Sequence, residues 1–200
     1  MNIDRDLQSI QEVRDLVAKA KEAEKTLCTF PQEKLDAICA SIASACMDHA
    51  EELAKMAVQE TGFGKWEDKV LKNKLGSAIT WESVKNMKTV GVLRENEETK
   101  VTEIGVPMGV VEALIPSTNP TSTVMYKSII SIKAGNAIVI SPHPGAKNCI
   151  TATYKIVKEA AERAGAPEGT VNCVSFTTVQ ATDALLKHPD VSIILATGGE

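Results

Sequence analysis

Hydrophobic and polar residues alternate with two different periodicities along this chain of 200 residues. In the first part, apolar residues recur every three or four positions, which is the spacing of helices with one buried face. From residue 109 onward, four short apolar runs alternate with amphipathic stretches long enough to be helices. The runs span residues 110–115, 137–140, 171–174 and 191–195. This alternation predicts an α/β fold with a parallel, doubly wound sheet.

The first 88 residues are predicted to be helical. One helix is expected to end near Leu27, and Pro31 fits the first turn of a second helix. A further helix should begin near Glu67, after the two glycines at 62 and 64. The apolar positions expected to be buried by this later helix are Val70, Leu71, Leu75, Ile79 and Val84.

Between residues 89 and 108 the period changes to that of strands. Two short segments, 89–93 and 99–104, flank a polar turn at 94–98, which predicts a β-hairpin or a pair of edge strands. We therefore expect a helical part at 1–88, a ribbon at 89–108 and a nucleotide-binding part at 109–200. The ribbon is either an edge of the main sheet or a protruding oligomer contact, and the sequence does not choose between them.

Composition excludes several classes of function. Apolar residues make up 44% of the chain but aromatic residues only 4%, so the core should be mainly aliphatic. The net charge of −4, without a basic block, argues against nucleic-acid binding. We expect no membrane span and no signal peptide, because no apolar run is long enough and the N-terminus has no secretion pattern. The five cysteines have no metal-ligand spacing and suggest reduced thiols in the cytoplasm.

The first strand-end loop runs from Pro116 to Thr121 and opens a helix. Ligands of doubly wound sheets bind at the carboxyl ends of the strands, so this loop is a candidate site. Asn119 before Pro120 is typical of an N-cap followed by proline at the first helical position. An asparagine amide beside a helix N-terminus can also donate to an oxyanion. The two roles can coexist through different atoms of the loop.

The second strand-end loop begins with Ser141, Pro142, His143 and Pro144. The two prolines stiffen the backbone on either side of the histidine. Such a loop at a helix N-terminus suits an adenosine ribose or a phosphate, and it also fits a rigid turn with a surface histidine. Lys147 would lie in the first helical turn, where the dipole disfavours a cation unless an anion binds nearby.

The third strand-end loop contains Thr197, Gly198 and Gly199. Adjacent glycines let backbone N–H groups approach a pyrophosphate closely, although a full dinucleotide fingerprint is absent. A helix should follow such a turn. We therefore expect this chain to be the N-terminal part of a longer protein.

Taken together, these loops resemble the aldehyde dehydrogenase family, and in particular its CoA-acylating acetaldehyde dehydrogenase branch. That branch includes the aldehyde half of bifunctional acetaldehyde–alcohol dehydrogenases. The most specific strings are the one around Asn119 and the Ser-Pro-His-Pro string at 141–144. The resemblance extends over nearly the whole chain, through residues 67–70, 88–93, 115–123, 127–128, 133–138, 141–147, 165–167 and 194–199.

The resemblance implies the reversible reaction of an aldehyde, NAD and coenzyme A to an acyl-CoA and NADH. A cysteine thiolate attacks the aldehyde in this chemistry, and an asparagine helps to hold the oxyanion. Asn119 matches that asparagine, but it lies three residues after Pro116 rather than two. Thr118 occupies the earlier position, so either residue is a candidate oxyanion donor.

The resemblance also assigns a set of cofactor-binding residues. Hydrolytic members carry a lysine where Ser141 stands here, and its loss removes a cation that would favour a 2′-phosphate. NAD is therefore expected rather than NADP. The expected cofactor-binding residues are Pro116, Ser117, Ser141, Pro142, His143, Thr197, Gly198 and Gly199.

The nucleophilic cysteine of the family lies beyond the glycine turn, so the catalytic cysteine domain is expected to be absent here. The five cysteines are expected to be structural, and the 200-residue chain alone to be inactive. The resemblance also implies a homo-oligomer formed through the ribbon together with C-terminal elements. Some members of the branch work in bacterial microcompartments through a short N-terminal extension, but helical residues begin almost at once here, so free cytoplasm is expected. Two alternatives remain: an acylating enzyme for another short aldehyde, such as succinate semialdehyde or sulfoacetaldehyde, and an inactive fragment that binds nucleotide or assembles with a partner.

Overall fold

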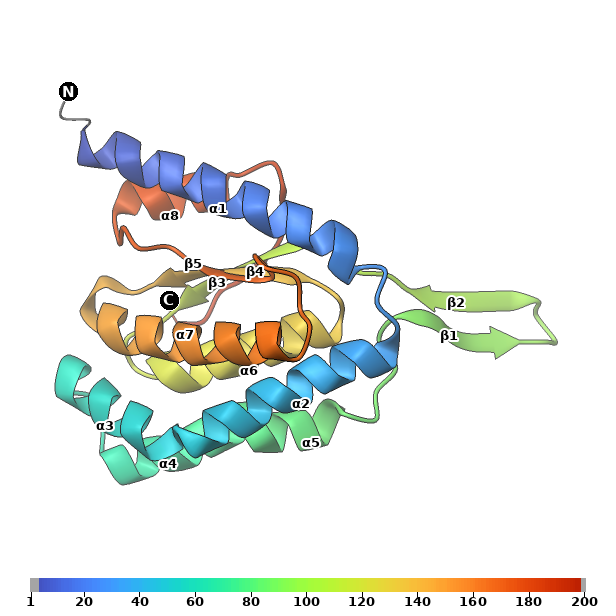
Figure 1. Cartoon of the computed structure of the whole chain (residues 1–200), viewed down its shortest axis with the longest axis horizontal. Coiled ribbons are helices and arrows are strands. Elements are labelled where there is room, and N and C mark those ends of the chain that lie inside the picture. The colour runs from blue at the N-terminus through green and yellow to red at the C-terminus, as the bar shows by residue number, and fades with distance from the viewer. Residues whose placement is uncertain (1–3, 199–200) are drawn as a thin grey trace.

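A sheet of four parallel strands lies between two layers of helices (Figure 1). The computed structural model describes residues 4–198. The strand order is β5-β4-β3-β6, and every neighbouring pair is parallel. This arrangement confirms the predicted doubly wound α/β fold. The strands are β3 (Val110–Ile115), β4 (Ala137–Pro142), β5 (Val171–Cys173) and β6 (Val191–Leu195).

The order of the strands creates a switch point between β3 and β6. The chain builds outward from β3 to β4 and β5, then returns to place β6 on the other side of β3. A switch point of this kind opens a crevice at the carboxyl edge of the sheet, where the loops that leave β3 and β6 begin. The crossover helices are α6 (Pro120–Lys133), α7 (Lys147–Arg163) and α8 (Val179–Leu186), and the 3-10 turn Pro144–Ala146 precedes α7.

The first helix is separated by the sheet from the other N-terminal helices. α1 (Arg5–Leu27) lies beside α8 on one face, where Val13 and Val17 pack in the same cluster as Val139 and Leu185. On the other face, α6 and α7 contact the sheet and are covered by a further layer. That layer contains α2 (Gln32–Asp48), α3 (Ala50–Thr61), α4 (Trp66–Lys74), a π-helix (Leu75–Ile79) and α5 (Thr80–Val84).

The larger core is aliphatic, as expected. Leu35, Ile38 and Ile42 of α2 pack with Ile129 of α6 and Ile150 of α7, all fully buried. Between residues 4 and 198, no helix is both long and apolar enough to cross a lipid bilayer.

The segment from α4 through the π-helix overturns one sequence prediction. Leu71, Leu75 and Ile79 were expected to be buried, but their exposed fractions are 65%, 57% and 54%. The inward face instead carries polar side chains, among them Lys69 and Asn73. These polar groups hydrogen-bond to neighbouring backbone and side chains, so their burial is compensated. The apolar residues are left on the opposite face.

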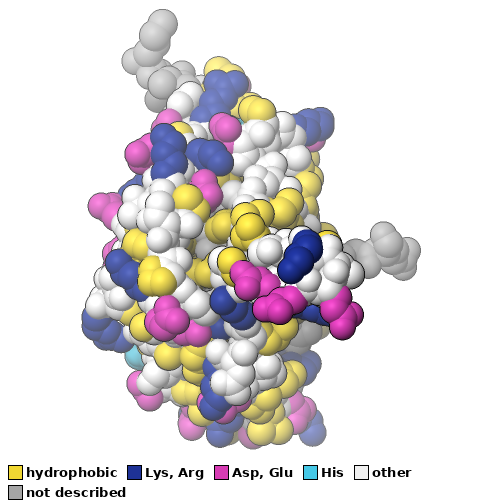
Figure 2. Space-filling view, turned by 90° about the vertical axis from the view of Figure 1, so that its right-hand side faces the viewer, with side chains coloured by type: hydrophobic (Ala, Val, Ile, Leu, Met, Phe, Trp, Pro, Cys, Tyr) yellow, Lys and Arg dark blue, Asp and Glu magenta, His cyan; other side chains and the backbone are white. Residues whose placement is uncertain are grey.

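The predicted ribbon forms a separate two-stranded antiparallel sheet that projects from the body (Figure 1). Its strands are β1 (Gly91–Asn96) and β2 (Val101–Gly105), so the turn lies later than the predicted 94–98. The cause is local: the Asn96 side chain accepts hydrogen bonds from the backbone N–H groups of Glu98 and Thr99, which sets the turn there. Figure 2 looks onto the end of this ribbon and shows charged side chains at its tip.

Two ionisable residues are buried in the centre of the fold. Glu112 of β3 is fully buried, and in the described part of the chain neither of its carboxylate oxygens has a hydrogen-bond partner. Burial raises its pKa to about 7, an effect that the charge of Lys127 partly offsets. Lys127 of α6 is also buried, and burial lowers its pKa to about 8. Its ammonium group donates to the backbone carbonyls of Leu114 and Leu195.

Glu112→Gln should change how stability depends on pH. The ordinary pKa of Glu112 is 4.5, and in the folded protein it is about 7. The folded state therefore keeps a proton that the unfolded state loses, so the free energy of unfolding falls as pH rises from about 4.5 through 7, by up to ~3 kcal/mol. Urea denaturation at several pH values should show the Gln variant gaining relative to the parent chain over this window. Glu103→Gln, on the exposed ribbon, is the matched control, and parallel curves for all three proteins would contradict the burial effect.

Candidate functional site

A cleft opens at the switch point, at the carboxyl ends of β3, β4 and β6. We call it the strand-end cleft. Its volume is about 450 Å³, within the range of small-molecule sites. It is lined by Leu114, Ile115, Pro116, Ser117, Thr118, Ser141, Pro142, His143, Pro144, Thr182, Thr197 and Gly198.

The strand-end cleft brings together seven of the eight residues that the sequence assigned to cofactor binding. Residues from all three strand-end loops line it, although they are up to 82 positions apart in the chain (Pro116 to Gly198). The eighth, Gly199, lies outside the described residues. Thr182 of α8 also lines the cleft and was not predicted.

Gly198 brings the loop after β6 close to the loop after β3. Its φ angle is +92°, a conformation that side-chain-bearing residues rarely adopt. A Cβ atom built there would lie 3.4 Å from Cβ of Pro116, which is ordinary van der Waals contact. The glycine is therefore required by its backbone conformation rather than by lack of space.

His143 serves both a local turn and the cleft. Its ring is exposed, and Nδ1 accepts a hydrogen bond of 3.0 Å from the backbone N–H of Gly145. This contact requires Nδ1 to be unprotonated, which leaves Nε2 as the ring nitrogen able to donate outward.

The N-terminus of α7 is occupied by a carboxylate from α3. Glu60 accepts hydrogen bonds from the backbone N–H groups of Asn148, at 2.8 Å, and Cys149, at 2.7 Å. Burial alone would raise the pKa of Glu60, but these backbone contacts outweigh it and lower the pKa overall. This carboxylate also compensates for Lys147 at the positive end of the helix dipole. These N–H groups are therefore already used and do not serve a phosphate.

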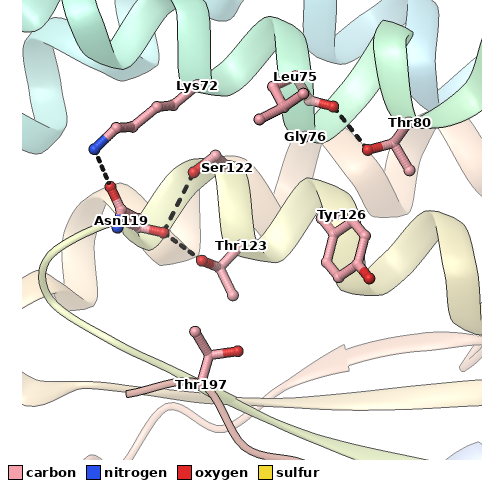
Figure 3. Close-up of a pocket in the computed structure, with 9 residues that line it drawn as sticks. All are labelled: Lys72, Leu75, Gly76, Thr80, Asn119, Ser122, Thr123, Tyr126 and Thr197. Atoms are coloured by element: carbon pink, nitrogen blue, oxygen red, sulfur yellow. Dashed lines mark hydrogen bonds between the residues drawn. The ribbon is translucent and has the colours of Figure 1, made fainter. Parts of the chain in front are cut away.

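A second cavity lies between α6 and the segment from α4 to α5. We call it the helix cavity (Figure 3). Its volume is about 550 Å³. Thr197 lines both cavities, so they adjoin at the loop after β6. The helix cavity is lined by Lys72, Leu75, Gly76, Thr80, Asn119, Ser122, Thr123, Tyr126 and Thr197.

Asn119 occupies the N-cap position of α6, with Pro120 following it, as predicted. Its side chain, however, makes no capping hydrogen bond. Instead Nζ of Lys72 donates to Oδ1 of Asn119 at 2.9 Å, while the backbone carbonyl of Asn119 accepts from Oγ1 of Thr123 at 2.6 Å (Figure 3). Because an ammonium group can only donate, this contact identifies the amide oxygen and turns the NH₂ group away from Lys72.

Thr118 and Asn119 are adjacent in sequence but line different cavities. Thr118 lines the strand-end cleft, and its backbone carbonyl accepts a hydrogen bond of 2.7 Å from buried Lys69. Asn119 lines the helix cavity. Burial lowers the pKa of Lys69, and the charge of Lys72 lowers it further, so two lysines of α4 lie close together above this loop.

None of the five cysteines lines either cavity. Burial raises the pKa of Cys39, Cys46, Cys149 and Cys173 to about 12, which keeps these thiols protonated at neutral pH. Cys28 is exposed at the end of α1. Thiols that stay protonated favour a structural role for Cys39, Cys46, Cys149 and Cys173.

Sequence reasoning missed most of the helix cavity. Lys72, Leu75 and Tyr126 were not singled out as site residues. The sequence carried no signal for this face, because Lys69, Lys72 and Asn73 at spacings of three and four are also what a solvated helix face carries.

The sequence and the structure were both compared with known proteins. The model of the aldehyde dehydrogenase family matches residues 6–200. The chain is 42% identical over 191 residues to the bifunctional aldehyde-alcohol dehydrogenase of Escherichia coli (strain K12), a match that covers 96% of this chain and 21% of that protein.

Two solved structures are also similar. A probable aldehyde dehydrogenase from Listeria monocytogenes EGD-e has a TM-score of 0.97 and 54% identity, covering 99% of this chain and 44% of that one. An acetylating aldehyde dehydrogenase from Geobacillus thermoglucosidasius has a TM-score of 0.96 and 52% identity, covering 98% and 43%. The chain thus spans less than half the length of each protein named here, and it belongs to the aldehyde dehydrogenase family.

Proposed function

We propose that this chain is the N-terminal, cofactor-binding part of an NAD-dependent, CoA-acylating aldehyde dehydrogenase. The reaction is acetaldehyde, NAD⁺ and coenzyme A going reversibly to acetyl-CoA, NADH and a proton. The observation that carries the proposal is the meeting of two cavities at Thr197. One has the position of a dinucleotide site, and the other presents an asparagine amide beside a helix N-terminus. The similar Geobacillus protein is described as acetylating.

NAD fits the strand-end cleft better than NADP does. NAD supplies a hydride acceptor when bound. The three loops offer it polar side chains, a close backbone at Gly198 and the free Nε2 side of His143. Among the described residues that line this cleft, none is a lysine or an arginine. A 2′-phosphate would therefore lack a cationic partner, whereas a ribose hydroxyl needs none.

Asn119 is the proposed oxyanion donor, rather than Thr118. When a thiolate adds to the aldehyde carbon, the carbonyl oxygen becomes negatively charged and needs donors that are already oriented. The amide NH₂ of Asn119 is such a donor, and the positive end of the α6 dipole lies beside it. Thr118 lines the other cavity, next to the proposed cofactor. The attacking cysteine is not one of the five in this chain.

Acetaldehyde is the proposed substrate because the helix cavity is mainly apolar. Leu75 and Tyr126 line it, and Lys72 is its one charged residue among those described. A succinate-semialdehyde dehydrogenase (acetylating) from Clostridium kluyveri is 37% identical to the chain. The carboxylate of succinate semialdehyde would have to compete with Asn119 for Lys72, which makes it the second candidate.

Coenzyme A is the proposed acyl acceptor. A propionaldehyde dehydrogenase from Rhodopseudomonas palustris, 30% identical with a TM-score of 0.76, was solved with bound CoA and an acylated cysteine. We further propose a homo-oligomer that uses the ribbon, because its exposed apolar side chains cost free energy in water. These are Val92, Leu93, Val101 and Ile104, with Val106 and Met108 just beyond. All five cysteines are free, which is compatible with a cytoplasmic location.

The overall proposal is tested by an activity assay on the full-length enzyme that carries this chain. NADH absorbance should rise with acetaldehyde only when coenzyme A is present, and should rise more slowly with succinate semialdehyde. The 200-residue chain alone should bind NAD in a calorimetric titration but form no NADH. Turnover by the chain alone would contradict the assignment of its cysteines, and CoA-independent turnover would contradict the acylating reaction.

Asn119→Ala in the full-length enzyme should lower kcat by about 10²–10³-fold, because one preorganised oxyanion donor is lost. Asn119→Asp should be at least as slow, since a carboxylate repels the developing charge. Steady-state kinetics and thermal unfolding together check the cause. The side chain makes no capping bond, so the melting temperature should hardly change. A loss of stability with normal kcat would reject the catalytic role.

His143→Ala should raise the KM for NAD several-fold while changing kcat less. The control is His143→Asn, whose side-chain oxygen can still accept from the Gly145 N–H group and so preserves the turn. If the ring itself contacts the cofactor, Asn should leave KM elevated. A normal KM in the alanine variant, measured by varying NAD at saturating aldehyde and CoA, would remove His143 from the cofactor site.

A further inference from the structure

Side chains of α4 hydrogen-bond to the segment that carries Asn119. Lys69 donates to the backbone carbonyl of Thr118 at 2.7 Å, and Lys72 donates to the side chain of Asn119 at 2.9 Å. Asn73 accepts from Oγ1 of Thr121 at 2.7 Å. Three side chains at helical spacings of three and four thus contact three positions of one loop.

α4 is also held in place by contacts with α3 and α6. Nδ2 of Asn73 donates to the backbone carbonyl of Ala50 in α3 at 2.9 Å, and Asn73 is fully buried. At Gly76, one turn further, the helix lies so close to α6 that an added Cβ would be 2.5 Å from the carbonyl oxygen of Ser122. The helix is therefore held at a fixed distance from the loop.

Within this arrangement, Lys72 has a distinct place. Lys69 and Asn73 are buried and hold the loop, whereas Lys72 is exposed and donates to the side-chain amide of Asn119. Figure 3 shows its side chain reaching from α4 across the edge of the helix cavity to the amide oxygen. An exposed lysine contributes little to folding through such a contact.

We propose that Lys72 is a positioning residue that orients the amide of Asn119 for oxyanion binding, an inference that rests on the proposed function. The ammonium group selects one of the two amide orientations, because the flipped amide would bring NH₂ against NH₃⁺. Both N–H donors of the amide then point away from α4. The ammonium group also polarises the amide, which makes its N–H groups better donors.

Nothing in this role requires Lys72 to touch the substrate. Removing it frees the amide to rotate and to flip, so the donor spends only part of its time in the productive orientation. Small misplacements of this kind are costly in catalysis, because the donor must already be aligned when charge develops. The loop itself should stay in place, since Lys69 and Asn73 still hold it.

The test is a double-mutant cycle in the full-length enzyme. Lys72→Met keeps the length of the side chain and removes the donor, and it should lower kcat roughly 10- to 100-fold with an unchanged KM for NAD. Lys72→Arg restores a cationic donor and should recover much of the rate. Lys74→Met, on the same helix and also exposed, is the matched control and should behave like the parent enzyme. Thermal unfolding should be nearly the same in all of them.

The decisive measurement is Lys72→Met in the Asn119→Ala background. If Lys72 acts through Asn119, the double variant should be no slower than Asn119→Ala alone, within about twofold. Additive losses, or a Lys72→Met enzyme as fast as Lys74→Met, would overturn the positioning role while leaving Asn119 as the oxyanion donor. Normal turnover by Asn119→Ala would instead overturn the proposed function, and the positioning role with it.

Discussion

A buried ammonium group joins the two strands between which the strand-end cleft opens. At a switch point, the last carbonyl groups of neighbouring strands diverge and lose their ladder partners. Lys127 of α6 donates to one such carbonyl in β3 and to one in β6. A carbonyl left unpaired away from water costs about 1–3 kcal/mol, and the buried Lys127 supplies a partner for both. The lysine thus joins the ends of β3 and β6 at the points where two of the loops that line the cleft begin.

The same loop serves two cavities because consecutive residues turn in opposite directions. Thr118 faces the strand-end cleft, and Asn119 faces the helix cavity, as the last residue before α6 begins. Lys69 holds the backbone at the point where this change of direction occurs. The proposed cofactor site and the proposed oxyanion donor thereby lie on either side of one peptide unit.

Local pattern predicted the sheet and its loops well, because both depend on short segments. Buried parallel strands appear as apolar runs, and the loops that follow them must gather at one edge. The burial prediction failed for α4. It assumed that the apolar face turns inward, because burying a polar side chain without a hydrogen-bond partner costs free energy. In α4 the buried polar side chains do have partners. Lys69 and Asn73 find theirs 49 and 48 positions away, at Thr118 and Thr121. The capping of α7 by Glu60, 88 positions away, was hidden for the same reason.

The π-helix at Leu75–Ile79 has a consequence for the register of the helices around it. A π-turn holds one residue more than an α-turn, so the segment after it is rotated by about 100° relative to a continuous α-helix. This offset lets α4 present lysine and asparagine to the loop while α5 presents Trp81 and Val84 to the aliphatic core. In a regular helix of the same sequence, either the polar side chains of α4 would miss the loop or the apolar side chains of α5 would miss the core. The wide turn thus absorbs one residue, so loss of a single residue from it would leave a regular α-helix whose two ends still face the same way, whereas an insertion elsewhere in the segment would rotate one face away from its partners.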